Sequence, residues 1–223
     1  MADVKLYLCD WKDVIPKLSA GLVDAVITDP PYGIAVATNY KARKRGALAQ
    51  CNDFVPVHGD DMPFDPSPFL GFKTVVLFGA NHYAGRLPRG AWHVWDKLDG
   101  LQSGREVGFN DNSDCEFIWS NTGNAARIFR HRWMGAMKGS EHAERRVHPT
   151  QKPIALMRQL IEYFTREGDT IFDPFMGSGA TGVACMQTGR NFIGSEIYEP
   201  YFSIAKARIE KAQAAIQLPM SCM

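Results

Sequence analysis

The chain has 223 residues, of which 45% are hydrophobic and 22% charged, and its formal net charge is +1. This balance is typical of a folded globular protein and excludes a disordered one. A net charge this close to zero gives no general argument for nucleic-acid binding, which would have to depend on local clusters. The five cysteines form no Cys-x-x-Cys pair, so reduced thiols are favoured over a zinc site. With no visible signal sequence or membrane span, we expect a cytoplasmic protein without a metal centre or membrane association.

Short apolar segments alternate with segments of helical periodicity along the chain. The periodicity predicts helices at 153–165, 179–186 and 201–216. Most of the apolar segments are continuous, as in strands buried on both faces of a parallel sheet. The predicted fold is therefore α/β, with a Rossmann-like, doubly wound, mostly parallel sheet of seven strands in a single domain spanning 1–223. The predicted strands are 4–8, 25–28, 74–78, 92–95, 115–119, 170–172 and 192–195.

Several ring-bearing residues lie on or after these predicted strands. Trp92, Trp95 and Trp119 are expected in the core, where large aromatic side chains usually pack. His82 follows the strand at 74–78, and either a pocket-lining or a structural role is open to it. His148 precedes a proline and is expected to anchor a loop rather than to act as a general base.

The strand at 25–28 ends in Asp29-Pro30-Pro31-Tyr32-Gly33. Two consecutive prolines cannot continue a central strand, and they restrict φ and remove two backbone donors. The pattern therefore predicts an acid and an aromatic ring held rigidly at the end of a buried strand.

A second motif, FDPFMGSGATGVA at 172–184, reads as strand, acid, glycine turn and helix. Gly177 and Gly179 permit positive φ and close approach of a ligand to the backbone, and a helix start offers unpaired N–H groups. No Gly-Lys-Ser/Thr follows, which disfavours phosphoryl transfer. Asp173 and Glu196 each end a strand on either side of this turn, at a spacing typical of an acid that binds a ribose. A ligand that contains a ribose is predicted.

Three motifs together, DPPYG at 29–33, HPTQKP at 148–153 and DPFMGSG at 173–179, resemble those of the S-adenosylmethionine-dependent DNA methyltransferases that modify adenine N6 or cytosine N4. The catalytic motif precedes the cofactor motif, as in the permuted β group of that family. The resemblance extends over 7–209. It implies a circularly permuted methyltransferase fold, S-adenosyl-L-methionine as cofactor, DNA with a flipped target base as partner, and a homodimer.

The resemblance also implies residue roles. In the catalytic motif, Asp29 and the Pro30 carbonyl would accept the hydrogens of the exocyclic amine, Pro31 would add rigidity, and Tyr32 would stack on the base. The glycine turn would hold the methionine part of the cofactor, aided by Lys152, while Glu196 would bind the ribose and Asp10 would lie near the adenine. The implied cofactor-binding residues are Asp10, Lys152, Asp173, Phe175, Gly177, Gly179 and Glu196.

Two basic clusters are candidates for binding DNA, although a charge run is usually a solvated face. The cluster at 41–45 follows the catalytic motif, and we expect phosphate contacts from it. The segment 121–147 occupies the recognition region of the family as a short insertion, and we expect base contacts from it. The residues concerned are Lys41, Arg43, Lys44 and Arg45, and Arg127, Arg130, Arg132, Lys138, Arg145 and Arg146.

These features predict a site-specific DNA methyltransferase of the kind found in restriction–modification systems. Asp rather than Ser at position 29 favours adenine N6 over cytosine N4 by the same resemblance. Methylation of RNA or of a protein glutamine is disfavoured by the motif order and by the Gln-Lys-Pro sequence. A catalytically silent DNA-binding protein of the same fold stays open as an alternative.

Overall fold

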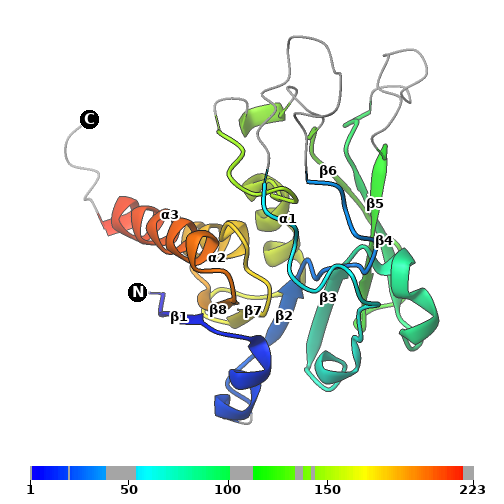
Figure 1. Cartoon of the computed structure of the whole chain (residues 1–223), viewed down its shortest axis with the longest axis horizontal. Coiled ribbons are helices and arrows are strands. Elements are labelled where there is room, and N and C mark those ends of the chain that lie inside the picture. Colours follow the sequence, from blue (N-terminus) through cyan, green and yellow to red (C-terminus); the bar gives the residue numbers. More distant parts are fainter. Residues whose placement is uncertain are drawn as a thin grey trace.

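The structure, a computed structural model, describes residues 2–19, 21–38, 54–100, 113–133, 138–141 and 144–217. Over these residues, eight strands form one sheet in the order β1-β8-β7-β2-β3-β5-β4-β6 (Figure 1). All seven predicted strands and all three predicted helices are present. The strands are β1 (Val4–Leu8), β2 (Ala25–Thr28), β3 (Thr74–Phe78), β4 (Ala91–Asp96), β5 (Cys115–Ser120), β6 (Ile128–Arg130), β7 (Thr170–Asp173) and β8 (Asn191–Glu196); the helices are α1 (Ile154–Phe164), α2 (Ala180–Gln187) and α3 (Glu199–Gln217).

The predicted count of seven strands is wrong by one strand, β6. It lies in the basic segment 121–147 and pairs in parallel with β4, with Val94 opposite Ile128. Three residues are too few for a recognisable period, so its formation depends on the neighbouring strand rather than on local pattern. The sheet is mostly parallel as predicted, since only β5 runs antiparallel to its neighbours β3 and β4.

The three α-helices all pack on one face of the sheet, where a single cluster of buried side chains joins them to the strands. The other face is covered by loops and by short 3-10 helices, among them η1 (Trp11–Asp13), η2 (Ile15–Lys17), η4 (Ser67–Phe69) and η5 (Ala80–Arg86). This differs from a sheet wound by α-helices on both faces. In the described part of the chain, no helix has both the length and the apolar character for crossing a membrane.

The tryptophans divide between core and surface. Trp95 and Trp119 are fully buried, which confirms the expectation for them. The expectation is wrong for Trp92, which is 37% exposed and packs edge-on against Phe117 at 6.5 Å. Alternate residues of β4 face opposite sides of the sheet. Trp92 lies on the face of the sheet that has no α-helices. β4 is next to the edge strand β6, and there the side chain of Trp92 is partly exposed to solvent.

The topology brings the two motifs together. β2 and β7 are parallel neighbours, with Val26 opposite Phe172. Their carboxyl ends therefore lie at the same edge of the sheet, although the motifs that follow them are more than 140 residues apart in sequence. The Thr28 hydroxyl donates to Asp173 Oδ1 at 2.6 Å and links the last residue of β2 to the end of β7.

Candidate active site

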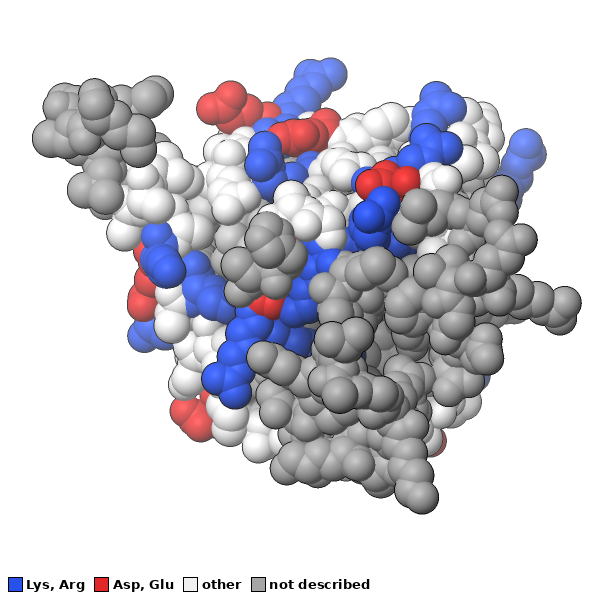
Figure 2. Space-filling view, turned by 90° about the horizontal axis from the view of Figure 1, so that it is seen from above, with Lys and Arg blue, Asp and Glu red and all other residues white. Residues whose placement is uncertain are grey.

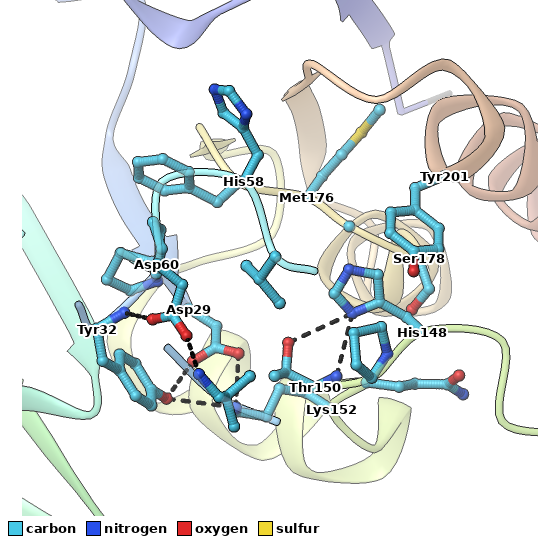
Figure 3. A pocket seen from close by; sticks show the side chains of 18 of the residues that line it. Asp29, Tyr32, His58, Asp60, His148, Thr150, Lys152, Met176, Ser178 and Tyr201 are labelled. Carbon is cyan, nitrogen blue, oxygen red and sulfur yellow. Dashed lines mark hydrogen bonds and ion pairs between the residues drawn. The ribbon is translucent and has the colours of Figure 1, made fainter. Parts of the chain in front are cut away.

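A cavity of about 2040 Å³ opens at this edge and is lined by residues from both motifs. Asp29 and Tyr32 contribute from the first motif (Figure 3). Gly177 contributes from the second motif, and Glu196 from the end of β8. The cavity is continuous, so a group bound at the glycine turn and a group bound at Asp29 would share one space. The residues that the structure describes contain no cluster of His, Cys, Asp or Glu able to hold a metal ion.

The Asp29 carboxylate is held from two sides. Its Oδ2 accepts a hydrogen bond from Lys152 Nζ at 2.6 Å, and its Oδ1 accepts one from the Tyr32 hydroxyl (Figure 3). Burial raises the pKa of Asp29, and the Lys152 ammonium works against that rise. The strand end and these two donors place a buried carboxylate in a fixed position on the cavity wall.

The loop that carries Tyr32 is fastened by Asp60, a residue that sequence reasoning missed. Asp60 Oδ1 accepts the backbone N–H groups of Tyr32 at 2.9 Å, Gly33 at 2.9 Å and Ile34 at 3.3 Å. Its Oδ2 accepts the Val36 N–H at 2.7 Å. One carboxylate thus satisfies four consecutive or nearly consecutive donors just after the double proline, which stabilises the loop conformation.

The Tyr32 ring has close neighbours behind it. It stacks on His82, with ring centroids 5.1 Å apart and planes within 13°. Gly79 has φ +62°, and a Cβ there would lie 2.1 Å from Tyr32 Cε1, so only glycine leaves room for the ring. Tyr32 lines the cavity and His82 does not. Of the two roles left open for His82, the structure favours support of Tyr32 over lining the pocket.

Lys152 lines the cavity beside Asp29. Besides Asp29, its Nζ contacts Glu116 Oε2 at 3.2 Å, and Lys97 Nζ contacts Glu116 Oε1 at 2.5 Å. Burial alone would lower the pKa of Lys152, but the carboxylates of Asp29 and Glu116 outweigh burial and raise it. The resemblance implied contact with the methionine end of the cofactor, which stays a prediction; in this structure the ammonium is bound to two carboxylates.

In the glycine turn, the two glycines have different structural roles. Gly179 has φ +78°, and a Cβ there would lie 3.0 Å from the Cα of Ala205, so glycine permits close packing of α2 and α3. The Gly177 N–H donates to Glu196 Oε2 at 3.0 Å, which ties the turn to the end of β8. Burial raises the pKa of Glu196, with the backbone N–H groups opposing it.

Asp173 holds the turn from beneath. It is 3% exposed and accepts the hydroxyls of Thr28 and Thr181, each at 2.6 Å, and the Phe175 N–H at 3.1 Å. Burial raises the pKa of Asp173 to about 6. Because its oxygens already accept hydrogen bonds from three protein donors, the Asp173 carboxylate has a structural role and fixes the backbone of the turn.

The cavity around the turn fits a ligand with a ribose and an aromatic ring. Asp10 lines it and caps η1 by accepting the Lys12 N–H at 3.0 Å, while Trp11 and Phe175 supply rings. Carboxylates at strand ends are suitable acceptors for hydroxyl groups. The buried Tyr201 hydroxyl, also on the cavity wall, has no hydrogen-bond partner among the described residues. The residues present therefore fit the cofactor that the sequence implies.

His148 stays neutral beside the turn. Burial and the nearby cations of Lys152 and Arg146 lower the pKa of His148 to about 3. Its ring packs edge-on against Tyr201 at 4.3 Å, and its Nδ1 accepts the Thr150 N–H at 3.3 Å (Figure 3). This is the geometry of a loop anchor.

The basic residues fall into three groups. Those at 41–45, Lys41, Arg43, Lys44 and Arg45, lie outside the described residues. Arg127, Arg130 and Arg145 are exposed, and Figure 2 shows lysine and arginine side chains gathered on the face of the molecule that it presents. The other three are partly buried: Lys138 Nζ donates to the Glu144 carbonyl, Arg146 donates to the His148 carbonyl, and Arg132 is half-buried. Two of the exposed arginines also make protein contacts, since Arg127 Nε donates to the Tyr163 hydroxyl at 3.0 Å and Arg130 Nε lies 3.5 Å from Asp96 Oδ2.

Comparisons with known proteins agree with this geometry. Residues 88–207 match the family model of the N6/N4 DNA methylases. The chain is 30% identical over 234 residues to the putative methylase YubD of Escherichia coli (strain K12), covering 93% of this chain and 91% of that protein. The crystal structure of the M1.HpyAVI–SAM complex is 25% identical with a TM-score of 0.56, covering 92% of this chain and 98% of the other. The cytosine-N4-specific PvuII DNA methyltransferase shares the fold, with a TM-score of 0.60 and 14% identity over all of this chain and 89% of that one.

Proposed function

The chain belongs to the family of N6/N4 DNA methylases, and we propose that it transfers a methyl group from S-adenosylmethionine to the exocyclic N6 amine of adenine in DNA. One observation carries the proposal: Asp29 and the glycine turn at Gly177 line the same continuous cavity. A methyl donor at the turn and an amine at Asp29 would therefore occupy one space and could approach each other directly. Aspartate at position 29, rather than serine, supports adenine over cytosine by resemblance.

The amine end of the site suits a direct displacement. The lone pair of an exocyclic amine is delocalised into its ring, so the enzyme must position the amine and draw on its hydrogens. The Asp29 carboxylate accepts one hydrogen, and the Pro30 carbonyl, fixed between two restricted φ angles, accepts the second. When bound, S-adenosylmethionine supplies a methyl group on a positively charged sulfur.

The cofactor end would be held by groups that already face the cavity. Glu196 and Asp10 would accept hydrogen bonds from the cofactor, Phe175 would pack against it, and the absence of a side chain at Gly177 would let the cofactor approach the backbone of the turn closely. Asp173 would act through the turn, because its oxygens are occupied by protein donors.

The base must leave the DNA helix to reach Asp29. Flipping costs about a few kcal/mol, and stacking on an aromatic ring returns about 1–3 kcal/mol. Tyr32 is suited to that contact, because it lines the cavity and is backed by His82 and Gly79. A flipped base on the face of the Tyr32 ring opposite His82 would stack on a ring that is held in place from behind.

Phosphate contacts are proposed for the basic cluster at 41–45, and base contacts for the exposed residues of segment 121–147, namely Arg127, Arg130 and Arg145. Removing one arginine that binds a phosphate should reduce the slope of log K against log salt by about 0.9. Replacing Arg43 and Arg45 together by glutamine should lower the measured slope by roughly two. An unchanged slope would remove these residues from the interface.

The function is tested by expressing the chain in cells that lack DNA methylation and mapping modified bases across the genome. N6-methyladenine at a defined short sequence is expected, and an Asp29→Ala variant produced at the same level should leave the genome unmodified. Modification only as N4-methylcytosine would refute the adenine assignment and support the cytosine alternative. Binding of S-adenosylmethionine and DNA without any modified base would support the silent DNA-binding protein.

The homodimer implied by resemblance also stays a proposal. Light scattering coupled to size-exclusion chromatography, with and without DNA, gives the mass of the species in solution. A mass of twice the 24.9 kDa of one chain would support a dimer, and a single-chain mass at working concentration would contradict it.

A further inference from the structure

Four charged side chains form a row along the cavity wall, which begins at Asp29 of the catalytic motif. Two of them, Lys97 and Glu116, belong to none of the sequence motifs. Lys97, Glu116, Lys152 and Asp29 all line the cavity, and their side chains are between 9% and 20% exposed. The charges alternate along the row. Consecutive contacts measure 2.5 Å from Lys97 to Glu116, 3.2 Å from Glu116 to Lys152, and 2.6 Å from Lys152 to Asp29.

The row is assembled from four parts of the fold. Asp29 directly follows β2, Lys97 directly follows β4, and Lys152 lies two residues before α1. Glu116 is the central member and lies within β5, opposite Trp95 of β4. A carboxylate inside an otherwise apolar strand requires partners, because a buried unpaired charge is costly. The two lysines are those partners.

Glu116 divides the charge of Lys152 between two acceptors. Without it, the ammonium would face Asp29 alone at 2.6 Å. The amine nitrogen that Asp29 receives becomes positively charged as it gains the methyl group, before it loses a proton. A full lysine charge this close would oppose that change, since charges in a partly buried site are weakly screened.

We propose that Glu116 is a positioning residue of the methyl-transfer site, which holds Lys152 and offsets part of its charge, so that the ammonium opposes the positive charge developing on the amine less strongly. The inference rests on the proposed function and extends it. Lys97 is the outer counter-ion, which keeps Glu116 ionised and in place. It also contacts the Trp95 ring at 5.0 Å, away from the reacting end of the cavity.

The titration behaviour agrees with this arrangement. The Lys152 and Lys97 ammonium groups lower the pKa of Glu116 although burial acts to raise it. The Glu116 charge in turn raises the pKa of Asp29, in the same direction as burial. Outside the row itself, the titratable groups that interact with its members are Tyr32, Tyr83, His148 and Asp173.

The test compares Glu116→Gln with the wild type in single-turnover methylation, at saturating S-adenosylmethionine and DNA, across pH. We expect the rate to fall by roughly tenfold to a hundredfold, with affinities for DNA and cofactor changed by less than about threefold. Glu116→Asp, which retains the charge, should recover part of the rate. Glu162→Gln is the matched control, because Glu162 is 51% exposed on α1 and far weaker in its pairing, 3.7 Å from Arg158.

The pH dependence gives a readout that a merely structural role would not move. Loss of the Glu116 charge should lower the pKa of Asp29, so the acid limb of the rate profile should move to lower pH in Glu116→Gln. Carbon NMR of the labelled Asp29 carboxyl should show the same direction without any methyl acceptor. A wild-type rate and profile in Glu116→Gln, or an unchanged Asp29 titration, would overturn the inference. If the wild type methylates no DNA, the proposed function fails, and the NMR titration still decides the role of Glu116.

Discussion

Replacing Lys152 by methionine tests how far this lysine stabilises the buried carboxylates around it. Its Nζ lies 2.6 Å from Asp29 and 3.2 Å from Glu116, and its side chain is 9% exposed. Methionine fills a similar volume but removes the charge. Removing one partner of a buried ion pair typically costs about 3–5 kcal/mol. For a chain of this length, each 1 kcal/mol corresponds to a fall in melting temperature of about 2–4 °C.

We therefore expect Lys152→Met to lower the free energy of unfolding, measured in urea at pH 7.5, by about 3–5 kcal/mol. Lys206→Met is the control, because Lys206 is 54% exposed and 3.9 Å from Glu210 on α3; its loss should cost less than about 0.5 kcal/mol. Adding Asp29→Asn to Lys152→Met should restore at least half of the loss, because Glu116 keeps Lys97 as its partner. A Lys152→Met protein as stable as the Lys206→Met control would refute the reasoning.

Predictions for three other positions follow from the geometry of the site. Tyr32→Phe keeps the ring on His82 and loses the hydroxyl bond to Asp29, whereas Tyr32→Ala loses both; only the alanine variant should weaken binding of DNA with 2-aminopurine at the target position, by about 1–3 kcal/mol in a fluorescence titration. The pKa of Asp173 is raised from 3.8 to about 6, so the stability it contributes is fully present below pH 3.8 and is lost as pH rises through 6. Between pH 5 and 7, the free energy of unfolding measured in urea should fall by about 1 kcal/mol more for the wild type than for Asp173→Asn. If this free energy depends on pH in the same way for both proteins, the raised pKa of Asp173 is contradicted. Gly179→Ala should destabilise the protein by roughly 2–4 kcal/mol, because it adds a close contact with Ala205 to the strain of a positive φ. Gly21 has nearly the same φ, but a Cβ there would have no atom within 4 Å. The loss of stability in Gly21→Ala should therefore come only from the strain of the positive φ.

The elements of the fold were predictable because they are encoded locally. Buried strands such as β3 read as continuous apolar runs, and α1 carries its apolar residues at helical spacing. The two motifs also indicated where Asp29 and Gly177 would lie, since ligands bind beyond the carboxyl ends of parallel strands. β6 was not predicted, because its three residues lie in a basic segment and form a strand only by pairing with β4.

The residues that support the site could not be predicted in the same way. Asp60 binds backbone N–H groups from Tyr32 to Val36, which precede it by 24 to 28 residues. In the sequence, Asp60 lies in a stretch that is recognisable only as a long polar loop. Glu116 meets Lys152 across the sheet, a contact that depends on the strand order β2-β3-β5-β4. A signal was present in its case, since an acid inside an apolar strand needs a counter-ion. No local pattern would have named Lys97 and Lys152 as that counter-ion.

The hydrogen bond from Thr28 to Asp173 bears on how far apart the two proposed binding regions lie. The loop at Asp29 and the turn at Gly177 follow adjacent strands of one sheet, whose spacing is about 4.8 Å. The Thr28–Asp173 bond, 2.6 Å long, joins the ends of these two strands. If the proposed function is correct, the separation of amine and methyl donor is set mainly by the main chain. Side-chain changes in the loop at Asp29 would then alter which amine is accepted more readily than they would alter that separation.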